Sequence, residues 1–229
     1  PGTDWITYTV QFTQPLVTTG DWFELITAPE AALRTADGLL GLVARAGAGD
    51  RVYVEQLYEY PHWGDPVSAP NLRLESYIAA ARRGAAVRIL LNGGTFDIKG
   101  FSLTNNVEAA ARVNQIAQNE GLDLSAHLGD PTHYGIHNKM VLVDLGAEGK
   151  YVHVGSINGS ESSSKVNREM ALQVRSAALF DYLYRVFEYD WNYQPPLGHL
   201  LISELMYRPA TNPLSGEWVE LYNPTAIPV

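Results

Sequence analysis

Apolar and polar positions along the chain fall into short strand-like runs separated by longer helix-like ones. Apolar and β-branched runs typical of strands occupy residues 50–58, 86–92, 122–128 and 169–174. We expect helices over about 28–46, 72–83, 105–119 and 177–191. The first of these helices is predicted from a capping box, Thr27 to Glu30, and the second from a cap at Asn71 and a stop at Gly84. This alternation predicts an α/β fold.

Two further apolar runs in the second half of the chain are joined by a glycine-containing turn. The first run reads KMVLVD from Lys139 to Asp144, and the second reads YVHVGS from Tyr151 to Ser156. Two glycines between them can take the positive φ that a tight turn requires. The segment therefore predicts a β-hairpin.

The hairpin also carries the residues that suggest a chemistry. The sequence order is His137, Lys139, Asp144, Ser156, Asn158 and Glu169. An imidazole can attack phosphorus, and ammonium, amide and hydroxyl groups can hold the charge of a phosphate. Because side chains alternate along a strand, His137 and Lys139 should share a face and Asp144 should point the other way. That parity favours a structural role for Asp144, such as pairing with a backbone group at the strand end.

The His-x-Lys-x4-Asp pattern followed by Gly-Ser-x-Asn resembles the signature of the phospholipase D superfamily. The resemblance extends over residues 22–191, including the segment AAARRG at 79–84 and the strand VRILL at 87–91. It implies a mixed β-sheet flanked by helices, and a two-step phosphotransfer through a phosphohistidine that needs no metal or other cofactor. It also implies roles for particular residues. The catalytic group would be His137, Lys139, Asp144 and Glu169, with His137 as nucleophile or acid and Glu169 orienting the imidazole, and Ser156 and Asn158 would bind the phosphate.

The chain departs from the family pattern because it contains one His-x-Lys pair, whereas the family's site needs two. The other five histidines are followed two residues later by glycine or leucine. The second motif is therefore expected from a homodimer partner or from another half-domain of a longer chain.

The C-terminal end favours the longer chain. Residues 200–229 resemble the opening of a lamin-tail domain, an immunoglobulin-like β-sandwich, but such sandwiches need about 100 residues. We expect an N-terminal strand segment over 1–21, the phospholipase-D-like half-domain over 22–191, a proline-containing linker over 192–199 and a truncated lamin-tail-like segment over 200–229. By analogy with such domain pairs, a bacterial protein that is secreted or on the cell surface is favoured, although the sequence leaves the compartment undetermined.

Composition limits the kinds of chemistry and of substrate that are expected. The absence of cysteine excludes disulfides, thiolate metal sites and cysteine nucleophiles. With a net charge of −9 the chain lacks the basic face expected of a nucleic-acid binder, and its one basic pair, Arg82-Arg83, suits a helix C-terminus. A phosphodiester such as a phospholipid is therefore the expected partner rather than a nucleic acid. No apolar run is long enough to predict a transmembrane segment.

An aromatic loop follows the first central strand, where ligands bind in α/β sheets. It contains Tyr60, His62 and Trp63, which either line a substrate cleft or pack over the end of the sheet. No metal site is expected, because His133 and His137 have helical ligand spacing in a segment whose proline and glycine disfavour a helix.

Two classes of function are consistent with these features. The first is a phosphodiesterase or phosphatidyl transferase, with a metal-independent nuclease as a variant of it. The second is a non-catalytic binding or structural module built on the same shell. A second His-x-Lys motif elsewhere in the full-length protein would support the enzyme.

Overall fold

A computed structural model describes residues 19, 21–64, 69–94, 101–132, 135–193, 201–206 and 218–222 of the chain. It divides into two units, residues 1–192 and 193–229, which are described separately. In the first unit the strands are β1 (Trp22–Ala28), β2 (Arg51–Gln56), β3 (Ala86–Asn92), β4 (Leu124–Gly129), β5 (Lys139–Asp144), β6 (Lys150–Gly155) and β7 (Glu169–Arg175). Its helices are α1 (Gly38–Ala44), α2 (Leu72–Arg82), α3 (Phe101–Glu120), α4 (Glu161–Lys165) and α5 (Ala177–Asn192).

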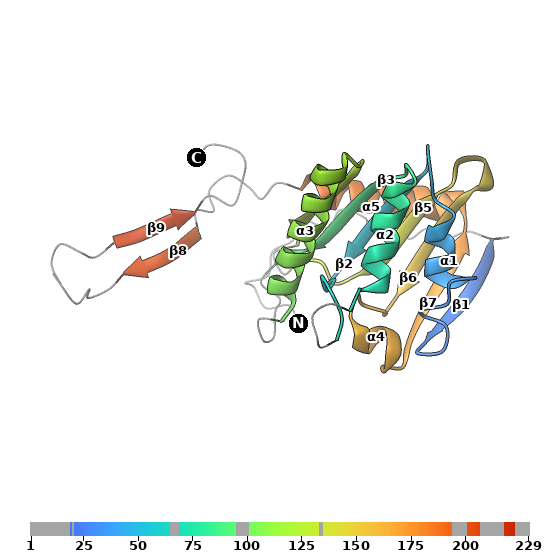
Figure 1. Cartoon of the computed structure of the whole chain (residues 1–229), viewed down its shortest axis with the longest axis horizontal. Helices are drawn as coiled ribbons and strands as arrows, with labels where there is room; N and C mark the ends of the chain where they lie inside the picture. Colours follow the sequence, from blue (N-terminus) through green and yellow to red (C-terminus); the bar gives the residue numbers. More distant parts are fainter. Residues whose placement is uncertain are drawn as a thin grey trace. The chain divides into compact units, whose positions relative to one another are not determined.

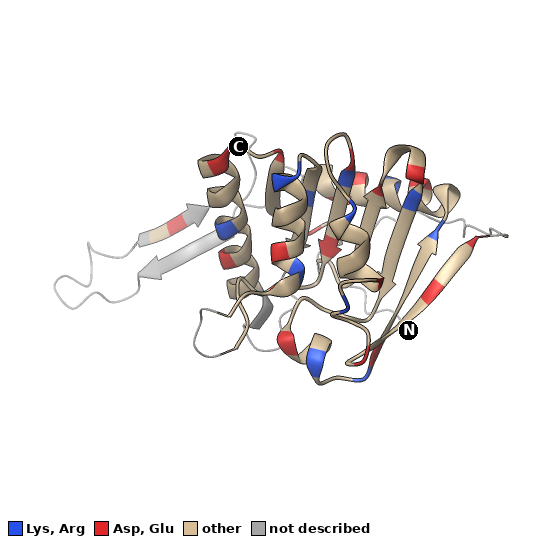
Figure 2. Cartoon of the chain, turned by 45° about the vertical axis from the view of Figure 1, so that its right-hand side comes forward, with Lys and Arg blue, Asp and Glu red and all other residues tan. Residues whose placement is uncertain are grey.

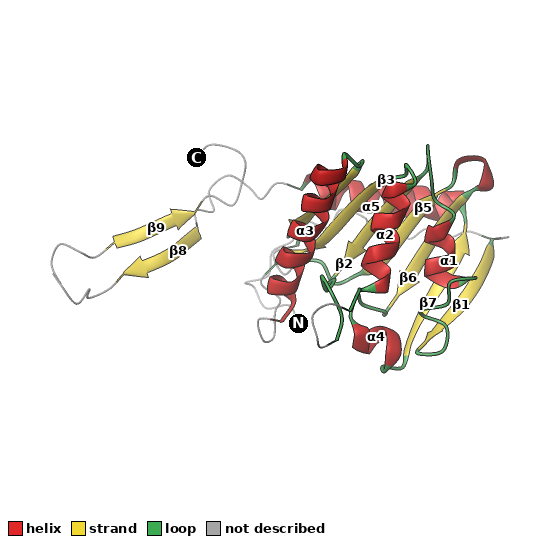
Figure 3. Cartoon of the chain, viewed as in Figure 1, coloured by secondary structure: helices red, strands yellow, loops and turns green. Residues whose placement is uncertain are grey.

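The strands of the first unit form one seven-stranded mixed sheet in the order β1-β7-β6-β5-β2-β3-β4 (Figure 3). Strands β2, β3 and β4 are parallel to one another, and every other neighbouring pair is antiparallel. The carboxyl ends of β1, β2, β3 and β6 therefore lie beside the amino ends of β5 and β7. Together they form one edge of the sheet that is made of strand ends and not of a side strand.

Helices cover both faces of this sheet. Helices α1, α2 and α3 lie on one face, and α5 lies behind the other (Figure 1). The core under the first three helices contains alternate strand residues that are fully buried, among them Val52, Val54, Ile89, Leu91, Val141 and Val143. The alternate set of strand positions packs against α5 and includes Leu90, Met140, Leu142 and Val152. Because the central strands are apolar on both faces, they can only be buried between two helical layers.

Most of the expected elements are confirmed, and so is the predicted α/β fold class. The predicted hairpin is β5 and β6, whose register pairs Val141 with His153. Asn71 caps α2 through hydrogen bonds from the backbone N–H groups of Arg73 and Leu74, and Gly84 ends the helical segment with φ of 97°. Helix α5 follows Ser176, whose hydroxyl accepts a hydrogen bond from the N–H of Leu179.

The long helix predicted over 28–46 is wrong. Residues Trp22–Ala28 instead form β1, an edge strand that pairs with β7, and only Gly38–Ala44 is helical. Strand pairing outweighs the capping box because Ile26 and Ala28 bury their side chains in a small core with Ile157 and Ala171. The sequence reading also missed the short helix α4, which lies in a serine-rich segment that looks like a loop.

The second unit contains two described strands, β8 (Leu201–Met206) and β9 (Trp218–Tyr222), paired antiparallel. The lamin-tail resemblance and the domain boundaries remain predictions. Residues 1–18 and the predicted linker from 194 onward lie outside the described residues. Among the described residues, none of the helices has the length and apolar character needed to cross a membrane.

Candidate functional site

The predicted site residues gather at the edge of the sheet where β2, β3 and β6 end. His137 lies two residues before β5, Lys139 begins that strand, and Glu169 begins β7. Ser156 and Asn158 follow β6 directly. The hairpin pairing therefore brings the two parts of the motif together, as the sequence predicted. This edge includes the carboxyl ends of the parallel strands, where α/β proteins bind ligands.

His137 and Lys139 are in direct contact. The Lys139 Nζ lies 3.2 Å from His137 Nδ1, and it also donates to the backbone carbonyl of His137. The two side chains differ in exposure, since His137 is exposed while Lys139 is only 8% exposed. The imidazole can therefore meet a ligand from solvent, with a largely buried ammonium behind it.

The electrostatics of this pair favour a neutral imidazole. Burial and then the positive charge of Lys139 lower the pKa of His137 below its usual value. Burial also lowers the pKa of Lys139 to about 8, although the carboxylate of Glu169 opposes that shift. At pH 7 the imidazole is thus mainly unprotonated and the ammonium mainly charged, which is the combination that a nucleophile beside an anion requires.

Glu169, at the start of β7, interacts with Lys139, and Ser156, just after β6, contacts β7. Glu169 is half-buried, interacts electrostatically with Lys139 and accepts a hydrogen bond from Asn167 Nδ2 at 3.3 Å. The Ser156 hydroxyl donates to the carbonyl of Met170 at 3.3 Å and accepts from the N–H of the same residue at 3.2 Å. Ser156 therefore bridges β6 to β7 in this state.

Asn158 is half-buried, and its Oδ1 is turned away from solvent without a hydrogen-bond partner among the described residues. The next residue, Gly159, is held on both sides by the loop after β2. Its N–H donates to the carbonyl of Tyr58 at 3.2 Å, and its carbonyl accepts from the N–H of Tyr60 at 3.3 Å.

Asp144 lies apart from these residues, at the other end of β5. Its carboxylate accepts a hydrogen bond from the N–H of Gly146 at 3.0 Å and so closes the turn after the strand. A strand of six residues places it roughly 16 Å from Lys139. The structure thus agrees with the parity argument for a structural role and sets Asp144 outside the candidate catalytic group.

The aromatic loop divides into two parts. Tyr60 and His62 are half-buried, whereas Trp63 is only 3% exposed. The indole N–H of Trp63 donates to the carbonyl of Gly159 at 3.1 Å. Trp63 therefore anchors the loop, and Tyr60 and His62 are the members that can line a substrate cleft.

Sequence reasoning missed a buried carboxyl pair on the α5 side of the same edge. The side chain of Asn138, between the histidine and the lysine of the motif, donates to Glu55 Oε1 at 2.7 Å. Glu55 is fully buried and interacts with Asp190 of α5, and burial together with that second carboxyl group raises its pKa. The sequence signal for this pair was Glu55 itself, a glutamate in the middle of an otherwise apolar strand.

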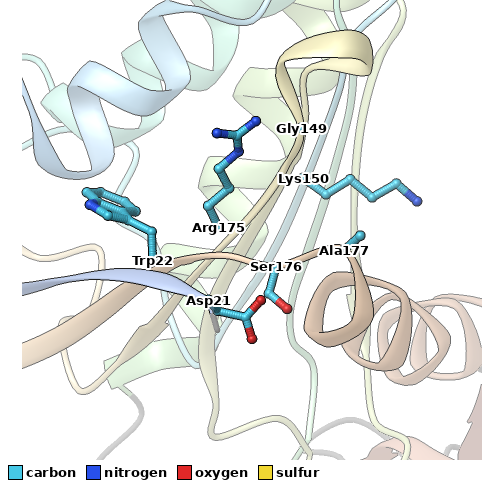
Figure 4. Close-up of a pocket in the computed structure, with 7 residues that line it drawn as sticks. All are labelled: Asp21, Trp22, Gly149, Lys150, Arg175, Ser176 and Ala177. Carbon is cyan, nitrogen blue, oxygen red and sulfur yellow. The ribbon is translucent and has the colours of Figure 1, made fainter. Parts of the chain in front are cut away.

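A surface hollow of about 420 Å³ lies at the opposite end of the sheet, so it is separate from the candidate site. Figure 4 shows Trp22, Arg175 and Lys150 on the strands that border it, with Asp21 and Ser176 beside each other. Figure 2 shows acidic and basic residues interspersed along the described elements of the first unit. In the segment between β6 and β7, the two cations Lys165 and Arg168 each pair with a glutamate.

A mixed sheet between two helical layers, with a His-x-Lys pair at the strand ends, defines the phospholipase-D-like class of α/β domain. Residues 65–191, more than half of the chain, match the family described as cardiolipin synthase, PLD-like domain, and the chain belongs to that family. Members of this superfamily are phosphodiesterases or phosphoryl transferases. No curated protein sequence matches the chain.

Solved structures agree on the fold. A phospholipase D family member from Salmonella typhimurium, Nuc, has a TM-score of 0.52 at 20% identity, and the match covers 76% of this chain and 95% of Nuc. NucT from Helicobacter pylori gives a TM-score of 0.52 at 15% identity, covering 75% of this chain and 96% of NucT. Phosphatidylserine synthase from Haemophilus influenzae gives 0.51 at 12% identity, with 74% of this chain but only 38% of the synthase covered.

Proposed function

We propose that the chain supplies half of a phosphodiester-cleaving site in which His137 forms a phosphohistidine. The observation that carries this proposal is the contact of the exposed His137 ring with the largely buried Lys139 Nζ at 3.2 Å. A neutral imidazole can attack, and a cation beside it can stabilise the negative charge that develops on the phosphate oxygens.

The reaction has two steps. In the first, an imidazole nitrogen of His137 bonds to phosphorus and the bond from phosphorus to the leaving oxygen breaks, while a histidine of the second half-domain gives that oxygen a proton. In the second, water or an alcohol gives its proton back to the same histidine and displaces the His137 nitrogen from phosphorus. Lys139 turns from the His137 ring to the phosphate, and the Asn158 amide donates to a second phosphate oxygen. Glu169 balances the charge of Lys139 between turnovers.

The second histidine has two candidate sources. Nuc and NucT are each covered almost completely by this one half-domain, so a site with two motifs would need two copies of such a chain. The phosphatidylserine synthase is covered only to 38%, which leaves room for a second half-domain in the same chain. A dilution series separates these options, because activity per mole of chain falls on dilution only if two copies associate.

The favoured substrate is a phospholipid or a similar small phosphodiester. Support comes from the description of the matching family as cardiolipin synthase and from the structural likeness to a phosphatidylserine synthase. The charges agree, because binding of a polyanion depends on several unpaired cations, whereas both cations of the segment after β6 pair with glutamates at 2.6–2.7 Å.

The test is hydrolysis of bis(p-nitrophenyl) phosphate by the 229-residue chain, with His137→Ala beside the wild type. We expect His137→Ala to abolish turnover, and an alkaline quench of the wild type to trap phosphate on His137, located by mass spectrometry. Equal rates in wild type and variant, or a label on another residue, would overturn the assignment. If the wild type is inert toward this compound and toward phospholipid vesicles, the non-catalytic module is supported instead.

The rate should depend on pH as a bell. The nucleophile must be neutral and the second histidine protonated. The value of kcat/KM is therefore highest between the two apparent pKa values and falls on either side of them. Since burial and Lys139 lower the pKa of His137, the acidic limb should lie below pH 6.5. A rate that climbs steadily into alkaline solution would contradict a pair of histidines.

A further inference from the structure

Three asparagines at the site edge of the sheet are completely buried, and their amides bind the backbone of the loops that carry the site. They are Asn71 at the start of α2, Asn92 at the end of β3 and Asn106 on α3, each 0% exposed. A buried amide must satisfy up to four hydrogen bonds, so its placement is strongly constrained by its partners.

Asn92 holds the segment that leads into His137. Its Oδ1 accepts from the N–H of Ile136 at 2.8 Å and from the N–H of Gly94 at 3.0 Å. The preceding residue, Gly135, has φ of 84°, and a Cβ at that position would collide with the Asn92 side chain. The approach of β3 to this segment is thus close, and the residue it fixes is next to the proposed nucleophile.

Asn106 ties Asn92 to the loop after β2. Its Nδ2 donates to the carbonyls of Leu57 and Asn92, each at 2.9 Å, and its Oδ1 accepts from the N–H of Glu59 at 2.9 Å. The N–H of Leu57 in turn donates to the carbonyl of Asn138 at 3.1 Å. One side chain therefore joins the end of β3 to the loop that reaches both parts of the motif.

Asn71 holds the other part of the site. Its Nδ2 donates to the carbonyl of Gly159 at 3.1 Å, to the carbonyl of Tyr60 at 2.7 Å and to Glu59 Oε1. Gly159 follows Asn158 directly, so this amide fixes the backbone from which the phosphate-binding amide projects. Its Oδ1 caps α2 independently of these contacts.

We infer that Asn71, Asn92 and Asn106 are positioning residues, which hold His137 and Asn158 at a fixed separation from each other. This role rests on the proposed function, because it matters for catalysis only if those two groups act on one phosphate. An error of about 1 Å in such a separation can lower a rate about 100-fold. An alternative is that these amides serve stability alone.

Asn114, which is exposed rather than buried, offers a control for that alternative on the same helix as Asn106. It also lies on α3, and its amide also binds strand backbone, accepting from the N–H of Ala126 at 2.9 Å and donating to the carbonyl of the same residue at 2.7 Å. Ala126 lies on the edge strand β4 and pairs with Ile89, three residues before the end of β3. Loss of the Asn114 amide should therefore disturb folding without disturbing the site.

The experiment compares four variants of the whole chain with the wild type. Asn92→Leu removes the acceptor for Ile136, whereas Asn92→Asp keeps it. Asn71→Ser keeps a cap for α2 but cannot reach Gly159. Asn114→Leu is the control. Hydrolysis of bis(p-nitrophenyl) phosphate is measured together with the NMR titration of the His137 ring, assigned by its loss in His137→Gln.

Positioning predicts a different pattern for each variant. Asn92→Leu should lower kcat about 100-fold with little change in KM, and Asn92→Asp should restore most of it. Asn71→Ser should raise KM about tenfold, because phosphate binding suffers. Asn114→Leu should leave both constants unchanged. The inference is overturned if Asn114→Leu lowers kcat as Asn92→Leu does, or if Asn92→Asp is as poor as Asn92→Leu.

The NMR titration separates failure of this inference from failure of the proposed function. If the wild type hydrolyses nothing, the proposed function fails, and the His137 titration still reports on the position of the ring. We expect the pKa of His137 to move up toward 6.5 in Asn92→Leu as the ring leaves Lys139 and becomes more exposed. An unchanged titration in a folded Asn92→Leu variant would overturn the positioning role, and so would an equal shift in Asn114→Leu.

Discussion

Glu55 and Glu59 are fully buried carboxyl groups four residues apart, at the same edge of the sheet and on opposite faces. Glu55 faces α5, where it accepts from Asn138 and meets the carboxyl group of Asp190. Glu59 faces α2, where it accepts from Asn71 and lies near the guanidinium of Arg73. Each contacts one part of the candidate site. Glu55 binds Asn138 of the His-x-Lys segment, and Glu59 binds Asn71, which holds the residue after Asn158.

Their surroundings give the two groups different charge states. Burial raises the pKa of both, but the neighbouring Asp190 raises that of Glu55 further, while Arg73 and Asn71 hold that of Glu59 to about 7. Glu55 is therefore a neutral acid at pH 7 that can share its proton with Asp190. Glu59 ionises just above neutral pH, where its charge is opposite to that of the buried Arg73. The comparison shows that burial raises both pKa values and that the sign of the neighbouring charge decides how far each is raised.

The largest expected effect comes from Glu59→Gln. Burial raises the pKa of Glu59 from 4.5 to about 7, and Arg73 offsets only part of that cost, so wild-type stability declines as pH rises through 7. Glutamine cannot ionise. We therefore expect the variant to match the wild type at pH 4 and to exceed it at pH 8.5 by up to about 3 kcal/mol in the free energy of unfolding, measured by urea denaturation.

A second variant checks the cause of that gain. Arg73 lowers the pKa of Glu59, so Arg73→Met should move the folded pKa of Glu59 further up and shift the decline in stability to higher pH. An unchanged decline in Arg73→Met would mean that the two groups do not interact.

Glu55→Gln should have the same sign, and its effect should begin at higher pH because Asp190 raises the pKa of Glu55 further. The folded pKa of Glu55 lies above its unfolded value of 4.5, so wild-type stability is full below pH 4.5 and declines as pH rises through the folded pKa. Glutamine keeps the oxygen that accepts from Asn138 and cannot ionise. We expect the variant to match the wild type at pH 4 and to exceed it at pH 9 by roughly 1 kcal/mol or more.

The measurement is the difference between two curves of unfolding free energy against pH. Glu59 contributes a decline of the same sign in both proteins, because its pKa is also raised, and it cancels in the difference. A variant that is less stable than the wild type at pH 9 would show that the charged form of Glu55 stabilises the fold, and the effect ascribed to burial and Asp190 would be wrong.

The sequence predicted those parts of the site that depend on local order. The hairpin brings His137, Lys139, Ser156 and Asn158 together because turn glycines and strand parity are readable from neighbouring residues. The same parity placed Asp144 on the opposite side. The sheet strands β2, β3, β5, β6 and β7 were predicted for the same reason.

The parts that the sequence did not predict depend on partners distant in the chain. Asn71 was recognisable as a helix cap, but its contact with Gly159 joins residues 88 positions apart. Glu55 meets Asp190 only because α5 packs behind β2. The helix predicted after Thr27 failed similarly, because the residues that lead into it, Trp22–Ala28, pair with β7, some 140 positions later. Local signals cannot report such pairings.

The smallest expected effect is that of Asp144→Asn, which provides a reference carboxylate that belongs to neither buried group. Asp144 lies on the same hairpin as His137, but its oxygen only closes the turn at Gly146 with a hydrogen bond of 3.0 Å. Asparagine can accept the same hydrogen bond, so the unfolding free energy should change by less than about 0.5 kcal/mol. Hydrolysis of bis(p-nitrophenyl) phosphate should stay within about twofold of the wild type, since the residue lies a strand's length from Lys139. A loss of kcat as large as that of His137→Ala would instead assign Asp144 to the reaction, and the separation of turn from site along β5 would be wrong.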